Sequence, residues 1–259
     1  EAIKSRITKG KTIKAIILVH IYGMPAKIED IVKISRKYGI PLIEDAAEAL
    51  GSMYDGKVIA TFGLFGVYSF NGNKIITTSG GGALLSKNKQ LIEKAKFLAT
   101  QARDDKSYYH HSEVGYNYRM SNVCAGIGLG QLNVLKQRIS KRREIFDFYK
   151  KELDGFYNIS FNIEPNKYFS NRWLTTIILS DNSAIDNEKI RLHLEKKNIE
   201  SRPLWKPMHL QPIFNESKIF GGKISERLFD RGLCLPSGTS MKEEDLYRVV
   251  NSIKMLYEE

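Results

Sequence analysis

The stretch Tyr68–Gly82 reads Tyr-Ser-Phe-Asn-Gly-Asn-Lys-Ile-Ile-Thr-Thr-Ser-Gly-Gly-Gly, and one lysine, Lys74, lies in its middle. Residues 67–70 are mostly β-forming side chains, which predicts a short strand. Asn71-Gly72 is a turn signal. The β-rich run Ile75–Thr78 predicts a second strand that ends at three glycines. The pattern therefore indicates that Lys74 is held in a tight turn between two buried strands.

Lys74 has two interpretations on this local sequence. A lysine in a turn is most often a surface residue or one half of a structural ion pair. The other interpretation is a Schiff-base lysine, whose amine is kept neutral by partial desolvation and by nearby positive charge. The turn itself does not separate the two, so the residues upstream decide.

The upstream stretch Ile40–Gly51 reads Ile-Pro-Leu-Ile-Glu-Asp-Ala-Ala-Glu-Ala-Leu-Gly. Its first four residues form an apolar run that is typical of a central parallel strand. Glu44 and Asp45 follow at the carboxyl end, where ligands bind in open α/β sheets. Pyridoxal phosphate needs a carboxylate that keeps its pyridine nitrogen protonated and a lysine that holds its aldehyde, and Asp45 and Lys74 match these needs. Asp45 also fits the N-cap of a short turn over residues 46–50, and the two roles are compatible.

A series of ordered motifs resembles the DegT/DnrJ/EryC1/StrS sugar aminotransferases, which are fold-type-I pyridoxal phosphate enzymes. The resemblance covers essentially the whole chain, and it is greatest to the branch that aminates C4 of UDP-4-keto-6-deoxy-N-acetylglucosamine on the route to UDP-bacillosamine. The motifs that carry it are Glu44-Asp45-Ala46-Ala47, Gly51-Ser52, Thr61-Phe62-Gly63, Ser69-Phe70, Lys74, Thr77-Thr78-Ser79-Gly80-Gly81, Gly115-Tyr116-Asn117-Tyr118-Arg119-Met120-Ser121-Asn122, Arg202-Pro203-Leu204-Trp205-Lys206-Pro207-Met208-His209 and Cys234-Leu235-Pro236-Ser237-Gly238.

The fold that the resemblance implies is α/β. A mixed, mostly parallel sheet flanked by helices would form the large pyridoxal phosphate-binding domain over residues 1–137, with the N-terminal part of the family fold missing. A smaller α/β domain would follow over residues 138–259. Apolar periodicity predicts strands at 15–19 and 172–179 and helices at about 28–38, 88–99, 121–153, 185–198 and 243–256.

The resemblance also implies site residues. Lys74 and Asp45 would be catalytic, and Glu48, Ser69 and Asn117 would join them in binding pyridoxal phosphate. Ser69 and Asn117 match positions that contact the cofactor phosphate, and Asn117 and Arg119 match positions that, in the family, reach into the site of the neighbouring subunit. Glu48 stands where much of the family has a glutamine beside the phenolic oxygen of the cofactor, and a carboxylate there is repulsive unless the two oxygens share a proton.

Three further residues are expected to contact substrate by the same resemblance. Arg119 would lie near the nucleotide diphosphate, which an arginine fork fits well. A core ion pair is an equally open interpretation of this arginine. Tyr118 belongs to a loop rich in tyrosine and histidine, and such amphipathic rings suit a sugar or uracil face. His209 matches a family position close to the substrate.

Composition excludes several other classes of protein. The chain has 259 residues, 42% hydrophobic and 27% charged, which is typical of a soluble globular protein. The net charge is +11, but the lysines are interspersed with acidic residues and no nucleic-acid motif is present. No apolar run is long enough for a membrane span, and Cys124 and Cys234 are expected to be reduced in a cytoplasmic protein. The adjacent pair His110-His111 does not predict a metal site, because neighbouring side chains point apart.

The resemblance implies an aminotransferase that moves an amino group from an amino acid, L-glutamate being expected, to a nucleotide-linked 4-ketosugar such as UDP-2-acetamido-2,6-dideoxy-4-keto-hexose. A homodimer with shared active sites is expected, and neither a nucleic acid nor a membrane is an expected partner. Amination at C3 instead of C4 stays open. C3 dehydration is disfavoured, because that branch of the family replaces the lysine by histidine. An alternative from another class is a truncated or degenerate paralogue that folds and associates without turnover.

Overall fold

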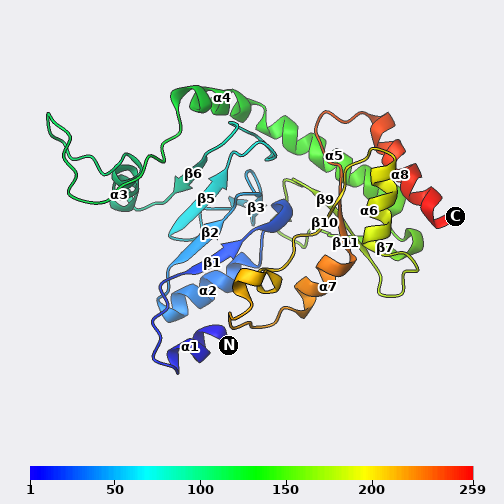
Figure 1. Cartoon of the computed structure of the whole chain (residues 1–259), viewed down its shortest axis with the longest axis horizontal. Coiled ribbons are helices and arrows are strands. Elements are labelled where there is room, and N and C mark those ends of the chain that lie inside the picture. Colours follow the sequence, from blue (N-terminus) through cyan, green and yellow to red (C-terminus); the bar gives the residue numbers. More distant parts are fainter. Residues whose placement is uncertain (259) are drawn as a thin grey trace. The chain divides into compact units, whose positions relative to one another are not determined.

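Two compact units make up the chain in the computed structural model, which describes residues 1–258 (Figure 1). The first, here called the Lys74 unit, contains residues 12–139 and 165–173. The second, here called the His209 unit, contains residues 1–11, 140–164 and the chain from 174 onward. The expected domain division between residues 137 and 138 stays a prediction; along the chain the two units meet between Ile139 and Ser140, and each also takes in a segment from elsewhere.

A four-stranded sheet carries the Lys74 unit. Its strands run in the order β1-β2-β5-β6, in which the first two pairs are parallel and the last is antiparallel. Their bounds are β1 Ile16–Val19, β2 Leu42–Asp45, β5 Phe65–Ser69 and β6 Gly82–Leu85. Helix α2, Ile28–Tyr38, connects β1 to β2 and ends at Gly39, whose φ of 62° is left-handed. A glycine suits this position because it has no Cβ to clash.

The two faces of this sheet differ in exposure, because side chains alternate along each strand. On one face Glu44 and Tyr68 are buried among Ala46, Ala49 and Ile59. On the other, Ile17 is 67% exposed and its β2 partner is Ile43. We call this second side the open face; it is formed by Ile17, Val19, Ile43, Asp45, Phe65, Val67, Ser69 and Leu84.

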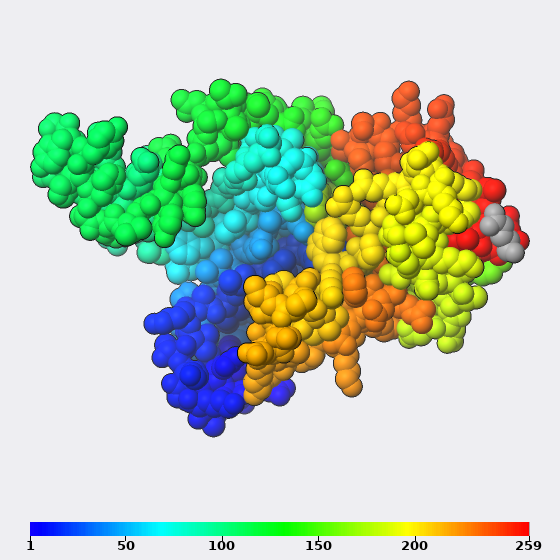
Figure 2. Space-filling model, viewed as in Figure 1, coloured from blue at the N-terminus to red at the C-terminus, as the bar shows by residue number. Residues whose placement is uncertain are grey.

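The remaining elements of the Lys74 unit are peripheral to this sheet. A small antiparallel sheet has the order β4-β3-β8. A loop between α3 and α4 holds exposed tyrosines and stands out from the sheet at the left of Figures 1 and 2. The bounds are η1 Ile21–Gly23, β3 Met53–Tyr54, β4 Lys57–Val58, α3 Lys89–Ala99, α4 Asn122–Asn133 and β8 Tyr168–Phe169.

The His209 unit packs helices against a second four-stranded sheet, whose antiparallel order is β10-β11-β9-β7. Its core includes Tyr149, Ile177, Leu194, Leu233 and Val250, all fully or almost fully buried. Helix α5 enters it from the Lys74 unit. The bounds are α1 Ala2–Ile7, α5 Leu135–Leu153, η2 Phe156–Asn158, β7 Ile159–Phe161, β9 Thr175–Leu179, α6 Asn187–Lys196, β10 Arg202–Pro203, η3 Met208–Leu210, η4 Pro212–Phe214, α7 Lys223–Arg231, β11 Gly232–Leu235 and α8 Glu243–Glu258.

The expected α/β fold is confirmed, and most elements lie close to their predicted ranges. Two expectations are wrong. Residues 75–78 form no strand: Ile75 and Ile76 are buried without strand pairing, and the partner of β5 begins only at Gly82. The long helix from residue 121 is divided into α4 and α5 at Val134, which has φ −104° and ψ 5°. None of the helices from residue 1 to 258 is both long enough and apolar enough to cross a bilayer.

Gly66 tests how closely β5 packs. A Cβ at this position would lie 2.1 Å from the carbonyl oxygen of Ala60, which is backbone and has little freedom to move. We expect Gly66→Ala to lower the free energy of unfolding by about 2 to 3 kcal/mol, measured by urea denaturation. The control Gly72→Ala meets open space at an ordinary φ and should be close to neutral. Equal stability of the two variants would contradict this packing.

Candidate active site

The carboxyl end of β2 directs two adjacent carboxylates to opposite sides of the sheet. Glu44 lies on the buried face and Asp45 on the open face, because neighbouring side chains alternate. Asp45 pairs with Val67 of β5, and Ser69 lies two residues further along that strand. Asp45 and Ser69 therefore project from the same face at the same edge, which is where ligands bind in open parallel sheets.

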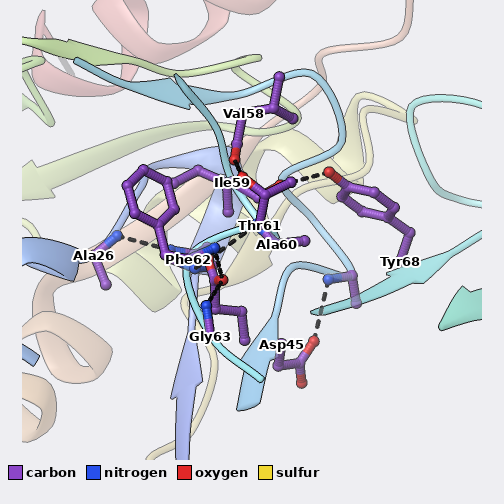
Figure 3. Close-up of polar contacts among 12 residues, drawn as sticks. Ala26, Asp45, Val58, Ile59, Ala60, Thr61, Phe62, Gly63 and Tyr68 are labelled. Carbon is purple, nitrogen blue, oxygen red and sulfur yellow. Dashed lines mark hydrogen bonds and ion pairs between the residues drawn. The ribbon is translucent and has the colours of Figure 1, made fainter. Parts of the chain in front are cut away.

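Glu44 is fully buried and accepts four hydrogen bonds. The backbone N–H groups of Ala60, Phe62 and Gly63 donate to its carboxylate at 2.9, 2.6 and 2.7 Å. His20 Nε2 lies 3.3 Å away, and because His20 Nδ1 accepts the N–H of Ala26, the ring proton is on Nε2 and points at Glu44. Figure 3 shows the bonds from Phe62 and Gly63 converging, with Asp45 apart from them.

The surroundings of Glu44 favour its ionised form. Burial alone would raise its pKa, but the hydrogen bonds from His20 and from the three backbone N–H groups together lower the pKa below its ordinary value. The same negative charge adds to the effect of burial on Tyr68, whose pKa rises to about 12. A buried carboxylate with this many donors fixes the loop over residues 60–63 against the end of β2.

Asp45 makes the local contact that its capping interpretation predicts. Its Oδ1 accepts the backbone N–H of Ala47 at 3.1 Å, and the chain then turns, with the N–H of Ala49 donating to the carbonyl of Ala46. Asp45 is only partly buried. The cap leaves room for a second role, because a carboxylate can accept more than one hydrogen bond.

Lys74 and Glu48 come together in the same unit. Lys74 closes the turn after β5, with its N–H donating to the carbonyl of Asn71 at 3.0 Å. Its Nζ lies 3.9 Å from Glu48 Oε1, and the two side chains are only 13% and 14% exposed. The surface-turn interpretation of Lys74 is therefore wrong, whereas an ion pair is present. Glu48 is held from a second direction, because its Oε2 accepts the N–H of Tyr22 at 2.5 Å.

Asn117, Tyr118 and Arg119 lie on the exposed loop that leads to α4. Asn117 forms an isolated bridge with Thr100, and the N–H of Tyr118 donates to the carbonyl of Ala99, so the backbone is tied to the end of α3. The ring of Tyr118 is 77% exposed and stacks on Tyr116 at 5.0 Å. Arg119 is exposed as well, so a core ion pair is not its role in this structure.

His209 lies in the other unit, on η3. Its Nε2 is 2.7 Å from Glu226 Oε1, and its ring packs beside Gly222, where an added Cβ would lie 3.0 Å from Cε1. The side chain is 15% exposed. These contacts do not test the expected role of His209 in binding substrate, and that role stays a prediction.

Sequence reasoning missed three residues that build this region. Glu44 was noted only as the neighbour of Asp45, although a second carboxylate at a strand end is itself a signal. Trp173 was placed in a strand over residues 172–179 and Asn171 was given no role, whereas β9 begins only at Thr175 and Arg172 has a left-handed φ of 52°. The polar run Ser170-Asn171-Arg172 before the apolar strand is the feature that could have indicated a later start of the strand.

Comparison with known proteins identifies the family. The family model described as the DegT/DnrJ/EryC1/StrS aminotransferase family matches residues 1–254. This chain belongs to that family. EpsN of Bacillus subtilis, provisionally described as a pyridoxal phosphate-dependent aminotransferase, is 48% identical over 260 residues, covering 99% of this chain and 66% of EpsN. The GDP-perosamine synthase of Escherichia coli O157:H7 is 39% identical, covering 98% of this chain and 68% of the synthase.

Solved structures agree with this assignment. A DegT/DnrJ/EryC1/StrS aminotransferase from Brucella abortus superimposes with a TM-score of 0.89 at 25% identity, covering 100% of this chain and 68% of its own. Helicobacter pylori PseC, an aminotransferase of pseudaminic acid biosynthesis, gives 0.86 at 25% identity, covering 95% and 67%. The chain thus spans about two thirds of the length of these relatives. These relatives do not assign the chain to the UDP-bacillosamine branch of the family.

The residues present fit pyridoxal phosphate. Lys74 supplies a primary amine that is mostly shielded from solvent beside a carboxylate, and Asp45 supplies a carboxylate on the open face at the strand ends. The hydroxyl of Ser69 lies at the same edge, where the N–H of Asn71 approaches its Oγ at 3.4 Å. An amine, a carboxylate, and a hydroxyl with nearby backbone N–H groups are the groups that an aldehyde, a pyridine nitrogen and a phosphate require.

Glu44 offers a test of this local structure through pH. Glu44→Gln turns an amide N–H₂ toward backbone donors, and we expect it to lower the free energy of unfolding by about 2 to 3 kcal/mol near neutral pH. Because the folded-state pKa lies below the ordinary 4.5, the contribution of the carboxylate is complete above that pH and is lost as pH falls through the folded-state value.

Urea denaturation of the wild-type protein and of Glu44→Gln, from neutral to acidic pH, measures the difference in their free energies of unfolding. Glu93→Gln is the control, since its carboxylate is 63% exposed and an exposed i,i+4 pair contributes little. A gap between wild type and Glu44→Gln that stays constant from neutral to acidic pH would contradict an ionised, hydrogen-bonded Glu44.

Proposed function

We propose that this chain is part of a pyridoxal phosphate-dependent aminotransferase that moves an amino group from an amino acid, L-glutamate, to a nucleotide-linked 4-ketosugar. The observation that carries the proposal is the amine of Lys74, shielded between the Glu48 carboxylate and the ring of Trp173, in a chain that belongs to an aminotransferase family. An exposed lysine side chain is mobile, whereas one that is shielded and held in place is typical of covalent catalysis.

Each residue of the site has a role in this proposal. When bound, pyridoxal phosphate supplies an aldehyde and a ring that accepts electrons. Lys74 would hold the aldehyde carbon and, after release, would move a proton away from Cα of the amino acid. Asp45 would keep the pyridine nitrogen protonated, and Ser69 would donate to the phosphate. Glu48, already close to Lys74, would lie beside the phenolic oxygen.

The acceptor is proposed to be UDP-2-acetamido-2,6-dideoxy-4-keto-hexose. Two relatives support this proposal, because each is named after a nucleotide-linked sugar. One is the GDP-perosamine synthase already described, and the other is the UDP-4-amino-4,6-dideoxy-N-acetyl-beta-L-altrosamine transaminase of Campylobacter jejuni, 32% identical over 270 residues. Arg119, Tyr118 and His209 are the proposed substrate contacts, Arg119 on the diphosphate and Tyr118 on a ring face.

A homodimer with shared sites is also part of the proposal. Every residue of α4 is at least partly exposed although the helix is mostly apolar, and Val123 and Leu129 are 75% and 67% exposed. An apolar surface of this kind is typical of a protein interface. A second copy there would give Asn117 and Arg119 a route to the neighbouring site. The cytoplasmic location expected from the sequence stays a prediction.

The first test is the visible spectrum of the purified protein with pyridoxal phosphate. We expect a band that disappears when glutamate is added and that is absent from Lys74→Ala. The control is Lys89→Ala, whose ammonium is 88% exposed on α3 and should leave the band unchanged. A non-catalytic paralogue predicts no band, and its absence from the wild-type protein would contradict the proposal.

The acceptor is tested on the glutamate-treated protein. We expect the 4-keto-6-deoxy UDP-sugar to restore the visible band faster than the corresponding GDP-sugar. Arg119→Lys should weaken the apparent affinity for either nucleotide by roughly tenfold, because lysine loses the bidentate contact to a diphosphate. Restoration by the GDP-sugar alone would contradict the proposed nucleotide and leave the aminotransferase reaction standing.

A further inference from the structure

The indole of Trp173 makes two separate contacts with the Lys74 turn. Its Nε1–H donates to the carbonyl oxygen of Asn73 at 2.8 Å. The face of the ring lies 4.4 Å from Lys74 Nζ, which is the geometry of a cation–π contact. Trp173 is itself only 2% exposed, so it is a fixed surface rather than a mobile one.

Asn171, two positions earlier, binds the backbone of Glu48, which is the partner of Lys74 in the ion pair. Asn171 Nδ2 donates to the backbone carbonyls of Glu48 and Leu50, both at 2.9 Å. Asn171 is fully buried, and its Oδ1 accepts the N–H of Trp173 at 2.9 Å. One short segment therefore binds the backbone that carries Glu48 and, through the indole, the backbone that precedes Lys74.

The position of Asn171 is itself closely defined. The N–H of Asn171 donates to Ser52 Oγ at 2.9 Å, and that hydroxyl donates to the carbonyl of Gly23 at 2.7 Å. A Cβ on Gly23 would lie 1.8 Å from Asn171 Oδ1, so only glycine leaves room for the amide. The segment is thus anchored to the rest of the Lys74 unit independently of Lys74.

We propose that Trp173 is a positioning residue that sets where the Lys74 amine lies relative to Glu48, with Asn171 fixing Trp173 in turn. The indole N–H holds the carbonyl next to Lys74, and the indole face limits the lysine side chain to the side where Glu48 stands. A lysine has a long flexible stem, so without such a surface its amine would sample many positions. The proposal rests on the proposed role of Lys74 in binding pyridoxal phosphate, but the contact itself does not.

The first experiment needs no cofactor. The sequence holds two tryptophans, and Trp205→Phe leaves Trp173 as the only one. In this background we expect Lys74→Met to raise the emission of Trp173, because an ammonium over an indole ring quenches it by proton transfer in the excited state. The control Lys89→Met removes an exposed lysine of α3 and should leave the emission unchanged. Equal emission with and without the Lys74 amine would overturn the contact.

The second experiment measures how fast the visible band forms with pyridoxal phosphate. Trp173→Phe keeps a ring face and loses the N–H, so we expect band formation to slow by roughly three- to tenfold. Trp173→Leu loses both contacts and should slow it by on the order of thirty- to a hundredfold. Thermal unfolding of the cofactor-free variants controls for folding, and slower band formation in a variant that unfolds at the wild-type temperature is the result that a merely structural role would not give.

The two failures are distinguishable. If Trp173→Phe and Trp173→Leu form the band as fast as the wild-type protein, the positioning role is overturned while the proposed function stands. If the wild-type protein forms no Lys74-dependent band, the proposed function fails, and the positioning role toward the cofactor fails with it. The fluorescence result reports the Lys74–Trp173 contact in either case.

Discussion

The candidate site depends on one buried carboxylate, that of Glu44. Its hydrogen bonds from His20 and from the backbone of residues 60–63 fix the last residues of β2 against a loop on the buried side of the sheet. Because side chains alternate along a strand, holding Glu44 on that side places Asp45 on the open face. Four donors make this arrangement tolerable for a buried charge, which without them would carry a large desolvation cost.

A second constraint acts from a distant part of the chain. Residues 170–173 bind the backbone after Asp45 through Asn171 and the backbone before Lys74 through Trp173. These bonds add to the strand pairing of β2 with β5 and to the Lys74–Glu48 ion pair, which also link the Asp45–Glu48 turn to the Lys74 turn. Lys74 is placed by an ion pair and an aromatic face together, and these contacts shield its amine from solvent.

Sequence reasoning located the parts of the site that depend on short-range patterns. Asp45 ends an apolar strand and Lys74 follows an Asn-Gly turn, so their positions could be predicted from neighbouring residues, whereas the turn alone left the role of Lys74 open. The strand expected at residues 75–78 was wrong because Ile75 and Ile76 are buried by packing, whereas periodicity reports only that they are apolar. The helix breaks at Val134, where neither a glycine nor a proline predicts a break. Trp173 and Asn73 are 100 residues apart in the sequence, and no local pattern predicts such a contact.

Covalent trapping tests the central claim most directly. The purified protein would be loaded with pyridoxal phosphate, reduced with borohydride and digested, and the peptides would be examined by mass spectrometry. The structure predicts that the reduced cofactor is attached to Lys74 and that Lys74→Arg carries no attachment there. Attachment to a different lysine, in a protein that still transfers amino groups, would contradict the assignment of Lys74.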